Sequence, residues 1–409
     1  MRKTKEEFKL LWFFYLSEFF EGIGFNLISG FSIIYFLTLG FTPLQISIFE
    51  VSMLLSTILF EVPTGAFADE YGRKKTVILS ALIAGIGFFL IPLSESFIII
   101  ILIHVLWGLS TALNSGADSA WFIDYTNKNK KGLLQKALSR VEQISSIAGI
   151  IGGFLGSAIL LITSNVLGFE FILGVKTLFI IVGIMLLLST LILAFFGKEH
   201  FKKRKKKTSA IKSNIQTSKK GFKYAINHPI IFKIIIATSM IYFASALITL
   251  GYQQFLKYEI GLEAEYFGIY IGVTSIFVTI LYSFNEFFLK KSGSEKKYSM
   301  IHAIILGFSL IISVITNNPI ISLLSFSVYF ITFSTARPIK TKWLNDHVTS
   351  KIRATVGSVE SIFYWVVTIL GNLILYGLVT EFFGLRVAFL ISGIITIIGG
   401  VTYATIKEK

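Results

Sequence analysis

The sequence predicts an all-α polytopic membrane protein, with twelve transmembrane helices in two pseudo-symmetric six-helix bundles. Three observations lead to this fold class. Hydrophobic residues make up 54% of the 409 residues, charged residues only 15%, and the mean hydropathy is +0.75, whereas a soluble domain carries about 25% charged residues. Apolar stretches long enough to cross a bilayer core, roughly 20 residues, recur along the chain. One long basic stretch divides them into two sets of six.

Turn signals and charges bound the twelve apolar segments. They lie near residues 8–38, 44–68, 76–94, 97–126, 138–164, 169–196, 229–257, 264–289, 298–316, 319–340, 353–380 and 385–406. The first segment carries two glutamates and no small-residue cleavage site, which favours an uncleaved membrane helix over a signal peptide. The domains expected from this division are an N-terminal bundle over 1–197, a basic linker over 198–228 and a C-terminal bundle over 229–409.

The placement of lysine and arginine predicts the orientation. If both termini are cytoplasmic, 32 of the 38 Lys and Arg fall in cytoplasmic segments, as the positive-inside rule requires. We therefore expect a multi-pass protein of the inner (cytoplasmic) membrane with both termini in the cytoplasm. The net charge of +15 then reflects topology and attraction to anionic lipid heads, and no nucleic acid is expected as a partner. A monomer is the expected state.

Several chemistries are missing from the sequence. There is no cysteine, which excludes disulfides, thiolate metal sites and cysteine nucleophiles. No HExxH zinc pair, GxSxG elbow or Gly-x4-Gly-Lys-Ser/Thr phosphate loop is present. A membrane enzyme is therefore disfavoured, no metal or cofactor is expected, and a proton gradient is the expected driving force.

A short internal repeat supports the two-bundle arrangement. Trp121 and Asp124, spaced by three, recur as Trp343 and Asp346, and both copies join the fourth span of a half to its fifth. Parallel repeats across two six-span halves are typical of one large class of secondary transporters.

The turn between spans two and three carries the most specific motif. It comprises Gly65, Asp69, Gly72, Arg73 and Lys74. Apart from Glu70, where a basic residue is usual, this stretch resembles the signature loop of the major facilitator superfamily, and the span count and central linker extend the resemblance to the whole chain. The resemblance implies alternating access, a conformational latch formed by Asp69 and Arg73, and a rocking mechanism rather than a channel. The alternative is that the basic residues merely anchor the loop inside.

The glycines of this motif have expected packing roles. Gly65 should let a neighbouring helix approach closely, and Gly72 should permit the tight turn. Four glycines of span five, Gly149, Gly152, Gly153 and Gly156, should likewise give a face that packs closely or slides.

One further string resembles bacterial drug efflux antiporters, and another antiporter signature is present only in degraded form. Glu61-x-Pro63 before the loop is similar to a variant signature of clostridial-type tetracycline efflux proteins. In span four, where such antiporters carry Arg-x-x-Gln-Gly, this chain has His104 through Gly108. The loss of the arginine puts a standard proton relay in doubt, although a histidine can itself titrate.

Ionisable residues within the spans predict a cavity for protons and substrate, because such residues are costly in a bilayer and usually face a cavity or a partner. The candidates are Glu18, Glu21, Glu50, Glu61, His104, Asp118, Trp121 and Arg337. Glu18 and Glu21 share one helix face, and Asn114, Asp118 and Trp121 form a stripe at i, i+4 and i+7. The alternatives are interhelical hydrogen bonding for the carboxylates, a solvated outer position for Glu50, and snorkelling for Arg337.

The repeat also predicts a gate. Glu142 and Glu360 occupy matching positions near the cytoplasmic starts of spans five and eleven. We expect them to form salt bridges there, with Arg140 and Arg353 as candidate partners.

The leading hypothesis is a secondary active transporter, most simply a proton-coupled antiporter exporting amphipathic drugs such as tetracyclines. The alternatives on the same fold are an uptake symporter for a sugar or peptide, and a flippase for a lipid-linked glycan. Cavity carboxylates without paired arginines would favour cationic or zwitterionic cargo, whereas Arg337 in the same cavity would favour anionic or sugar cargo.

Overall fold

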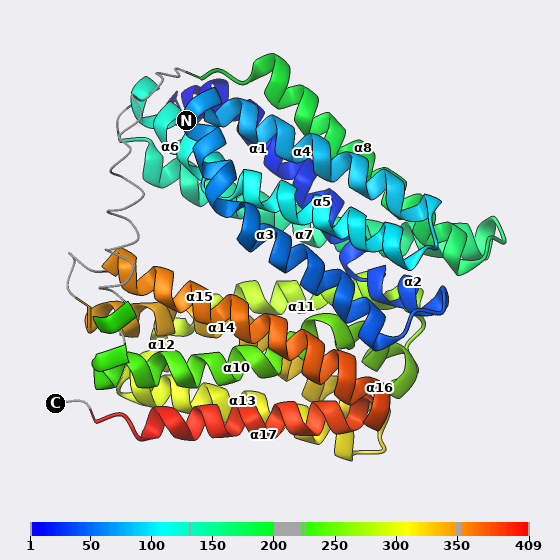
Figure 1. The fold of residues 1–409 in the computed structure, drawn as a ribbon, viewed down its shortest axis with the longest axis vertical. Helices are drawn as coiled ribbons and strands as arrows, with labels where there is room; N and C mark the ends of the chain where they lie inside the picture. The colour runs from blue at the N-terminus through cyan, green and yellow to red at the C-terminus, as the bar shows by residue number, and fades with distance from the viewer. Residues whose placement is uncertain (1, 131, 200–221, 225, 349–352, 408–409) are drawn as a thin grey trace. The chain divides into compact units, whose positions relative to one another are not determined.

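The computed structural model describes residues 2–130, 132–199, 222–224, 226–348 and 353–407. Every regular element in these ranges is helical, as the sequence predicts (Figure 1). The first half forms α1 (Arg2–Ser29), α2 (Ser32–Thr38), α3 (Pro43–Tyr71), α4 (Arg73–Leu90), η1 (Ile91–Leu93), α5 (Phe97–Asn114), α6 (Ala117–Asn129), α7 (Leu134–Leu161), η2 (Ile162–Val166) and α8 (Phe171–Phe196).

The second half repeats this all-helical pattern. Its elements are α10 (Pro229–Gln254), η3 (Phe255–Glu259), η4 (Ala264–Tyr266), α11 (Phe267–Tyr282), α12 (Asn285–Ser292), α13 (Glu295–Ile315), α14 (Pro319–Asp346), α15 (Arg353–Gly371), η5 (Asn372–Val379), α16 (Thr380–Phe383) and α17 (Leu385–Ala404).

The number of spans agrees with the prediction. Among the described residues, eleven helical stretches are long and apolar enough to cross a membrane. The pair Glu7–Ser29 and Ser32–Thr38, bent by 40°, makes a twelfth when it is counted as one span. The bend divides the segment predicted at 8–38 between α1 and α2.

Span four contains a short break between two helices, which the sequence did not predict. Helix α5 ends at Asn114 and α6 begins at Ala117. Gly116 between them has φ of +72°, a backbone conformation that glycine adopts without a steric penalty. The expected stripe of Asn114, Asp118 and Trp121 therefore does not lie on one uninterrupted helix, although Phe97–Asn129 as a whole is one apolar stretch long enough to span the membrane.

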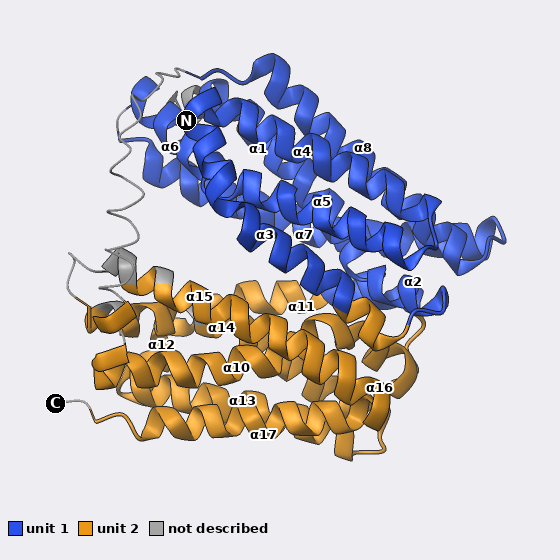
Figure 2. Ribbon diagram, viewed as in Figure 1, with its two compact units in different colours: residues 1–41, 48–205, 264–272 blue, residues 42–47, 206–263, 273–409 orange. Residues whose placement is uncertain are grey.

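The chain clusters into two compact units (Figure 2). Unit 1 comprises residues 1–41, 48–205 and 264–272, and unit 2 comprises residues 42–47, 206–263 and 273–409. Each unit has a buried aromatic core that contains one tryptophan of the repeat. Trp121 is 2% exposed and packs with Phe14 in unit 1, and Trp343 is 1% exposed and packs with Tyr403 in unit 2.

The glycines of span five hold α7 against α1 at very short range. A Cβ atom at Gly152 would lie 2.7 Å from the Ile23 carbonyl oxygen, and one at Gly156 would lie 2.4 Å from the Leu27 carbonyl oxygen. Real Cβ atoms do not approach backbone so closely, so glycine is required here. The close packing expected of this face is confirmed.

Candidate functional site

Unit 1 contains a cavity of about 480 Å³. Its walls come from α1, α4, α5, α6 and α8, with the break in span four at one side. The lining residues include Glu21, Phe25, Ser80, Ser110, Asn114 and Asp118. Two of the predicted carboxylates, Glu21 and Asp118, therefore face the same space.

Glu21 is held by a serine pair. The Ser189 hydroxyl donates to Glu21 Oε1 at 2.5 Å, the Ser17 hydroxyl donates to the same oxygen at 3.2 Å, and the two serine oxygens are 2.7 Å apart. Within the described part of the chain, no lysine, arginine or histidine pairs with Glu21 or Asp118. The cavity is therefore lined by carboxylates without a cationic partner, and hydroxyl groups position one of them.

A third carboxylate lies beside this cavity. Glu18 accepts a hydrogen bond from the Ser145 hydroxyl of α7, and it lies close enough to Asp118 and Glu142 for a charge on either to act on it. Asp118 lies close enough to Glu21 for its charge to act on that carboxyl group as well. The structure thus brings together Glu18, Glu21 and Asp118, although Glu18 does not line the cavity.

The other candidates of the first half lie elsewhere. His104 is 5% exposed, its Nδ1–H donates to the Ile100 carbonyl at 2.8 Å, and its ring stacks on Phe49. Trp121 is buried in the core described above, and its indole N–H donates to the Lys198 carbonyl at 3.1 Å. Glu50 and Glu61 lie on α3, outside the cavity lining, and Glu61 is exposed.

The signature loop ties α4 to α6. Gly72 has φ of +98° and precedes the first residue of α4, in keeping with its predicted place in the turn. Arg73 donates to the Ala120 carbonyl at 3.0 Å and forms an ion pair with Asp124. Asp69 is exposed and, among the described residues, forms no ion pair. The partner of Arg73 in this conformation is Asp124 rather than Asp69.

The same loop is bonded to the end of span six. Both oxygens of Glu199 accept backbone N–H groups of α4, from Arg73 at 2.8 Å and from Lys74 at 3.1 Å. The Lys74 ammonium donates to the carbonyls of Ala194 and Gly197, each at 2.8 Å. These contacts satisfy free groups at the N-terminus of α4 and the C-terminus of α8.

Gly65 has open space beside it. A Cβ atom at this position would meet no atom of the described residues within 4 Å. The close approach of a neighbouring helix that was expected at Gly65 is therefore not found in the part of the chain that the structure describes.

The predicted gate residues have separate surroundings. Arg140 lies 3.8 Å from Glu7, a fully buried carboxylate that Lys136 also contacts at 2.8 Å. Glu142 is exposed on α7. The side chains of Arg337 and Arg353 lie outside the described residues.

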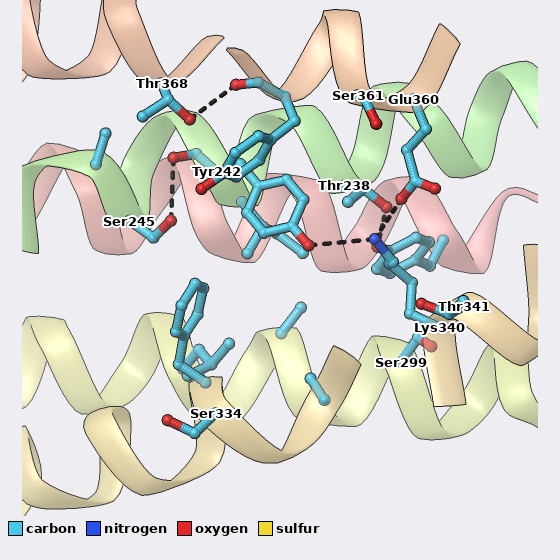
Figure 3. A pocket seen from close by; sticks show the side chains of 18 of the residues that line it. Thr238, Tyr242, Ser245, Ser299, Ser334, Lys340, Thr341, Glu360, Ser361 and Thr368 are labelled. Atoms are coloured by element: carbon cyan, nitrogen blue, oxygen red, sulfur yellow. Dashed lines mark hydrogen bonds and ion pairs between the residues drawn. The ribbon is translucent and has the colours of Figure 1, made fainter. Parts of the chain in front are cut away.

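Unit 2 contains a larger cavity of about 720 Å³ (Figure 3). Helices α10, α13, α14 and α15 supply most of its lining. Lys340 of α14 is 8% exposed, and its ammonium lies 2.5 Å from Glu360 Oε1 and 3.2 Å from the Tyr242 hydroxyl. Glu360, predicted to be a gate residue, thus pairs with a lysine in a cavity wall.

The sequence profile of the Major Facilitator Superfamily matches residues 14–359. The chain belongs to this superfamily. Its members are membrane transporters with an alternating-access fold, so the chain is a multi-pass transporter and not an enzyme.

Two relatives and one solved structure show what the chain is similar to. It is 28% identical over 145 residues to the uncharacterized MFS-type transporter YxaM of Bacillus subtilis (strain 168), which covers 35% of this chain and about a third (36%) of that relative. It is 23% identical over 417 residues to Multidrug resistance protein 2 of the same organism, covering 100% of this chain and 98% of the relative. The crystal structure of the nucleoside transporter NupG has a TM-score of 0.75 at 16% identity, covering 97% of this chain and 100% of that chain; it shows the shared fold alone.

Sequence reasoning missed two residues of this superfamily member. The sequence pattern places Lys340 in a basic cytoplasmic loop, although α14 continues to Asp346 and buries it. The signal that could have predicted a buried Lys340 was Glu360, a carboxylate on the next span that is available as its partner. Glu199 was missed because it lies next to a long lysine run that dominates the local pattern.

Proposed function

We propose that the protein is a proton-coupled antiporter that exports cationic or zwitterionic amphipathic drugs, tetracyclines among them, from the cytoplasm. The observation that carries this proposal is the cavity of unit 1, which presents Glu21 and Asp118 without a cationic partner among the described residues. An unpaired carboxylate in a span is costly and usually serves ions or substrate. A positively charged cargo supplies the missing counter-ion.

In this proposal the drug and the proton compete for one carboxylate, and this competition couples drug export to proton entry. Ionised Glu21 attracts the cationic drug. Protonation of Glu21 removes the negative charge, and the drug is then released. The Ser189 hydroxyl at 2.5 Å keeps the carboxylate oriented toward the cavity in either state. Protons entering from outside would then displace cargo, and their release to the cytoplasm would restore the binding site as the halves alternate.

Other observations support the proposal. The full-length similarity to a multidrug resistance protein agrees with a drug as cargo, and Phe25 and Trp107 offer aromatic surface in the same cavity. We further propose a monomer in the cytoplasmic membrane with both termini inside, from the distribution of lysine and arginine. No bound cofactor takes part in this mechanism.

The test is export by a drug-sensitive bacterium that expresses the protein. Susceptibility to tetracyclines, macrolides and cationic dyes is measured for the wild type, Glu21→Gln and Asp118→Asn at equal expression. Dye movement in everted membrane vesicles is then followed with an imposed pH gradient and after its collapse. Resistance and gradient-dependent dye movement are expected in the wild type and are expected to be lost in both variants.

Glu61→Gln is the matched control, because Glu61 is an exposed glutamate of α3 outside the cavity. It should retain wild-type resistance. If the protein gives resistance to none of the compounds, or if dye movement does not depend on the pH gradient, the antiporter proposal is wrong. The superfamily assignment would remain intact.

A second candidate is an uptake symporter for a sugar or peptide. The larger cavity of unit 2 favours it, because serine, threonine and tyrosine hydroxyls line much of that wall and suit a hydroxylated cargo. Uptake of labelled sugars and dipeptides by the same vesicles in right-side-out orientation distinguishes it: accumulation driven by an inward proton gradient would favour uptake over export.

A further inference from the structure

The cavity of unit 2 contains a buried cation. Lys340 is 8% exposed, and its ammonium faces the cavity beside Glu360 and Tyr242, as Figure 3 shows. Burying an ion pair is expensive, and such a pair adds little to stability compared with apolar packing. Stability alone therefore does not account for a lysine at this position.

The hydrogen bonds of Lys340 leave part of it available. An ammonium group has three N–H donors. One donates to Glu360 Oε1 at 2.5 Å and another to the Tyr242 hydroxyl at 3.2 Å, and the ammonium also lies 5.0 Å from the centre of the Tyr242 ring. The third donor has no acceptor among the described residues. An incoming anion can accept a hydrogen bond from this third donor. It can also replace Glu360 as the acceptor of another Lys340 donor.

Several hydroxyl groups of the wall present acceptors to the cavity. The hydroxyls of Ser245, Thr249 and Thr368 each donate to a backbone carbonyl three or four residues earlier in their own helix. Because these protons are used, the hydroxyl oxygens present lone pairs to the cavity. An anionic group of a ligand is therefore attracted to Lys340, whereas these three positions suit hydroxyl or amine donors on a ligand.

An aromatic surface lies next to the ammonium. The rings of Tyr242 and Tyr364 meet edge to face with centroids 4.8 Å apart, and the Phe333 ring is 6.5 Å from Tyr242. All three residues line the cavity. A flat aromatic body can pack against these rings while its charged end reaches Lys340.

We propose that unit 2 holds a binding site for an aromatic carboxylate or a comparable aromatic anion, with Lys340 as its cation and Glu360 as the internal counter-ion that the ligand displaces. The site differs from the carboxylate cavity of unit 1 in charge and in the elements that form it. The inference does not depend on the direction of transport or on proton coupling.

Binding of a matched pair of probes to the purified full-length protein tests this site. 2-Naphthoate and 2-naphthamide share shape and aromatic area and differ in charge. A ligand that binds the folded state raises the unfolding temperature in a concentration-dependent way. We expect 2-naphthoate to raise it saturably and 2-naphthamide to leave it nearly unchanged.

Variants of the ion pair sharpen the test. Lys340→Gln should weaken 2-naphthoate binding by about tenfold to a hundredfold, the equivalent of a lost charge-assisted hydrogen bond. Glu360→Gln removes the competing carboxylate and should tighten binding. If Lys340→Gln fails to fold, the double variant Lys340→Gln with Glu360→Gln removes both charges, and it should also lose binding.

Two controls separate binding at this site from binding elsewhere on the protein. Lys342→Gln changes an exposed lysine of the same helix, which pairs with Glu295 and Asp346, and it should bind 2-naphthoate as the wild type does. Glu21→Gln should impair export yet leave 2-naphthoate binding intact. Failure of the proposed export function can therefore be told apart from failure of the proposed anion site. Equal stabilisation by the amide, no saturable binding by the wild type, or undiminished binding without Lys340 would each overturn the proposal.

Discussion

Arg73, the first residue of α4, forms an ion pair with Asp124 of α6 and donates to the Ala120 carbonyl one turn earlier. The Asp124 side chain is 72% exposed, and exposed ion pairs contribute only about 0–1 kcal/mol to stability. The contact therefore matters more for holding the loop and α6 in one arrangement than for the free energy of unfolding.

Replacing Arg73 with Gln should reduce transport severalfold while the free energy of unfolding changes by less than about 1 kcal/mol. Dye export from cells and thermal unfolding of the purified protein measure the two effects. Lys75→Gln, a change at an exposed neighbour, is the control and should export normally. A charge exchange, Arg73→Asp with Asp124→Arg, should recover part of the export, and equal export by all variants would contradict a role for this pair.

The carboxylate of Glu199 caps the N-terminus of α4, so its removal should destabilise unit 1. Glu199→Ala should cost about 1 kcal/mol, as the loss of an N-terminal cap does in other helices. Thermal unfolding checks this value. Glu170→Ala is the matched control: Glu170 also precedes a helix, α8, but its side chain makes no capping bond. Equal effects of the two substitutions would show that capping is not the cause.

The contact of α7 with α1 should tolerate no side chain at Gly156. Gly156→Ala places a Cβ atom 2.4 Å from the Leu27 carbonyl oxygen, so the two helices must separate, at a cost of about 1–3 kcal/mol. Gly149→Ala, whose nearest neighbour atom is 3.5 Å away, should be nearly neutral. Expression level and unfolding temperature compare the two, and similar values would contradict the close packing of α7 on α1.

The break in span four should depend on the backbone freedom of Gly116. No atom of the described residues lies within 4 Å of a Cβ atom at this position, and φ is +72°, so Gly116→Ala should cost about 1–2 kcal/mol through conformation alone. Gly116→Asn should cost less, because asparagine tolerates the left-handed region. Unfolding temperatures in the order glycine, asparagine, alanine are expected, and an alanine variant as stable as the wild type would disprove this role of Gly116.

Hydropathy predicted the spans well because each membrane helix needs about the same length of apolar sequence. That length can be recognised from consecutive residues alone, without knowledge of the neighbouring helices. The break at Gly116 could not be predicted in the same way, since one glycine in an apolar helix is often tolerated. The outcome there depends on neighbours, and the side chain of Thr64, on another span, donates to the Ala112 carbonyl just before the break.

The pairing of charges was harder to predict than their presence. The sequence places Arg73 near Asp69 along the chain, yet the partner in this conformation, Asp124, is 51 residues away. Lys340 could equally have been a solvated loop residue, and it is buried because α14 extends past it. Glu21 and Asp118 line one cavity, in keeping with the cost of bare charges in a bilayer, which restricts where they can face, and their role in binding protons or substrate stays a prediction.

The interruption of span four has a consequence for how the cavity beside it can be studied. A helix that starts at Ala117 leaves the N–H groups of its first turn without acceptors in its own helix, and α5 ends at Asn114 at the same wall. Main-chain dipoles therefore contribute to the polarity of this space together with Glu21 and Asp118. Side-chain substitution cannot remove them, so an alanine scan of the wall will underestimate how strongly the space holds water or polar cargo.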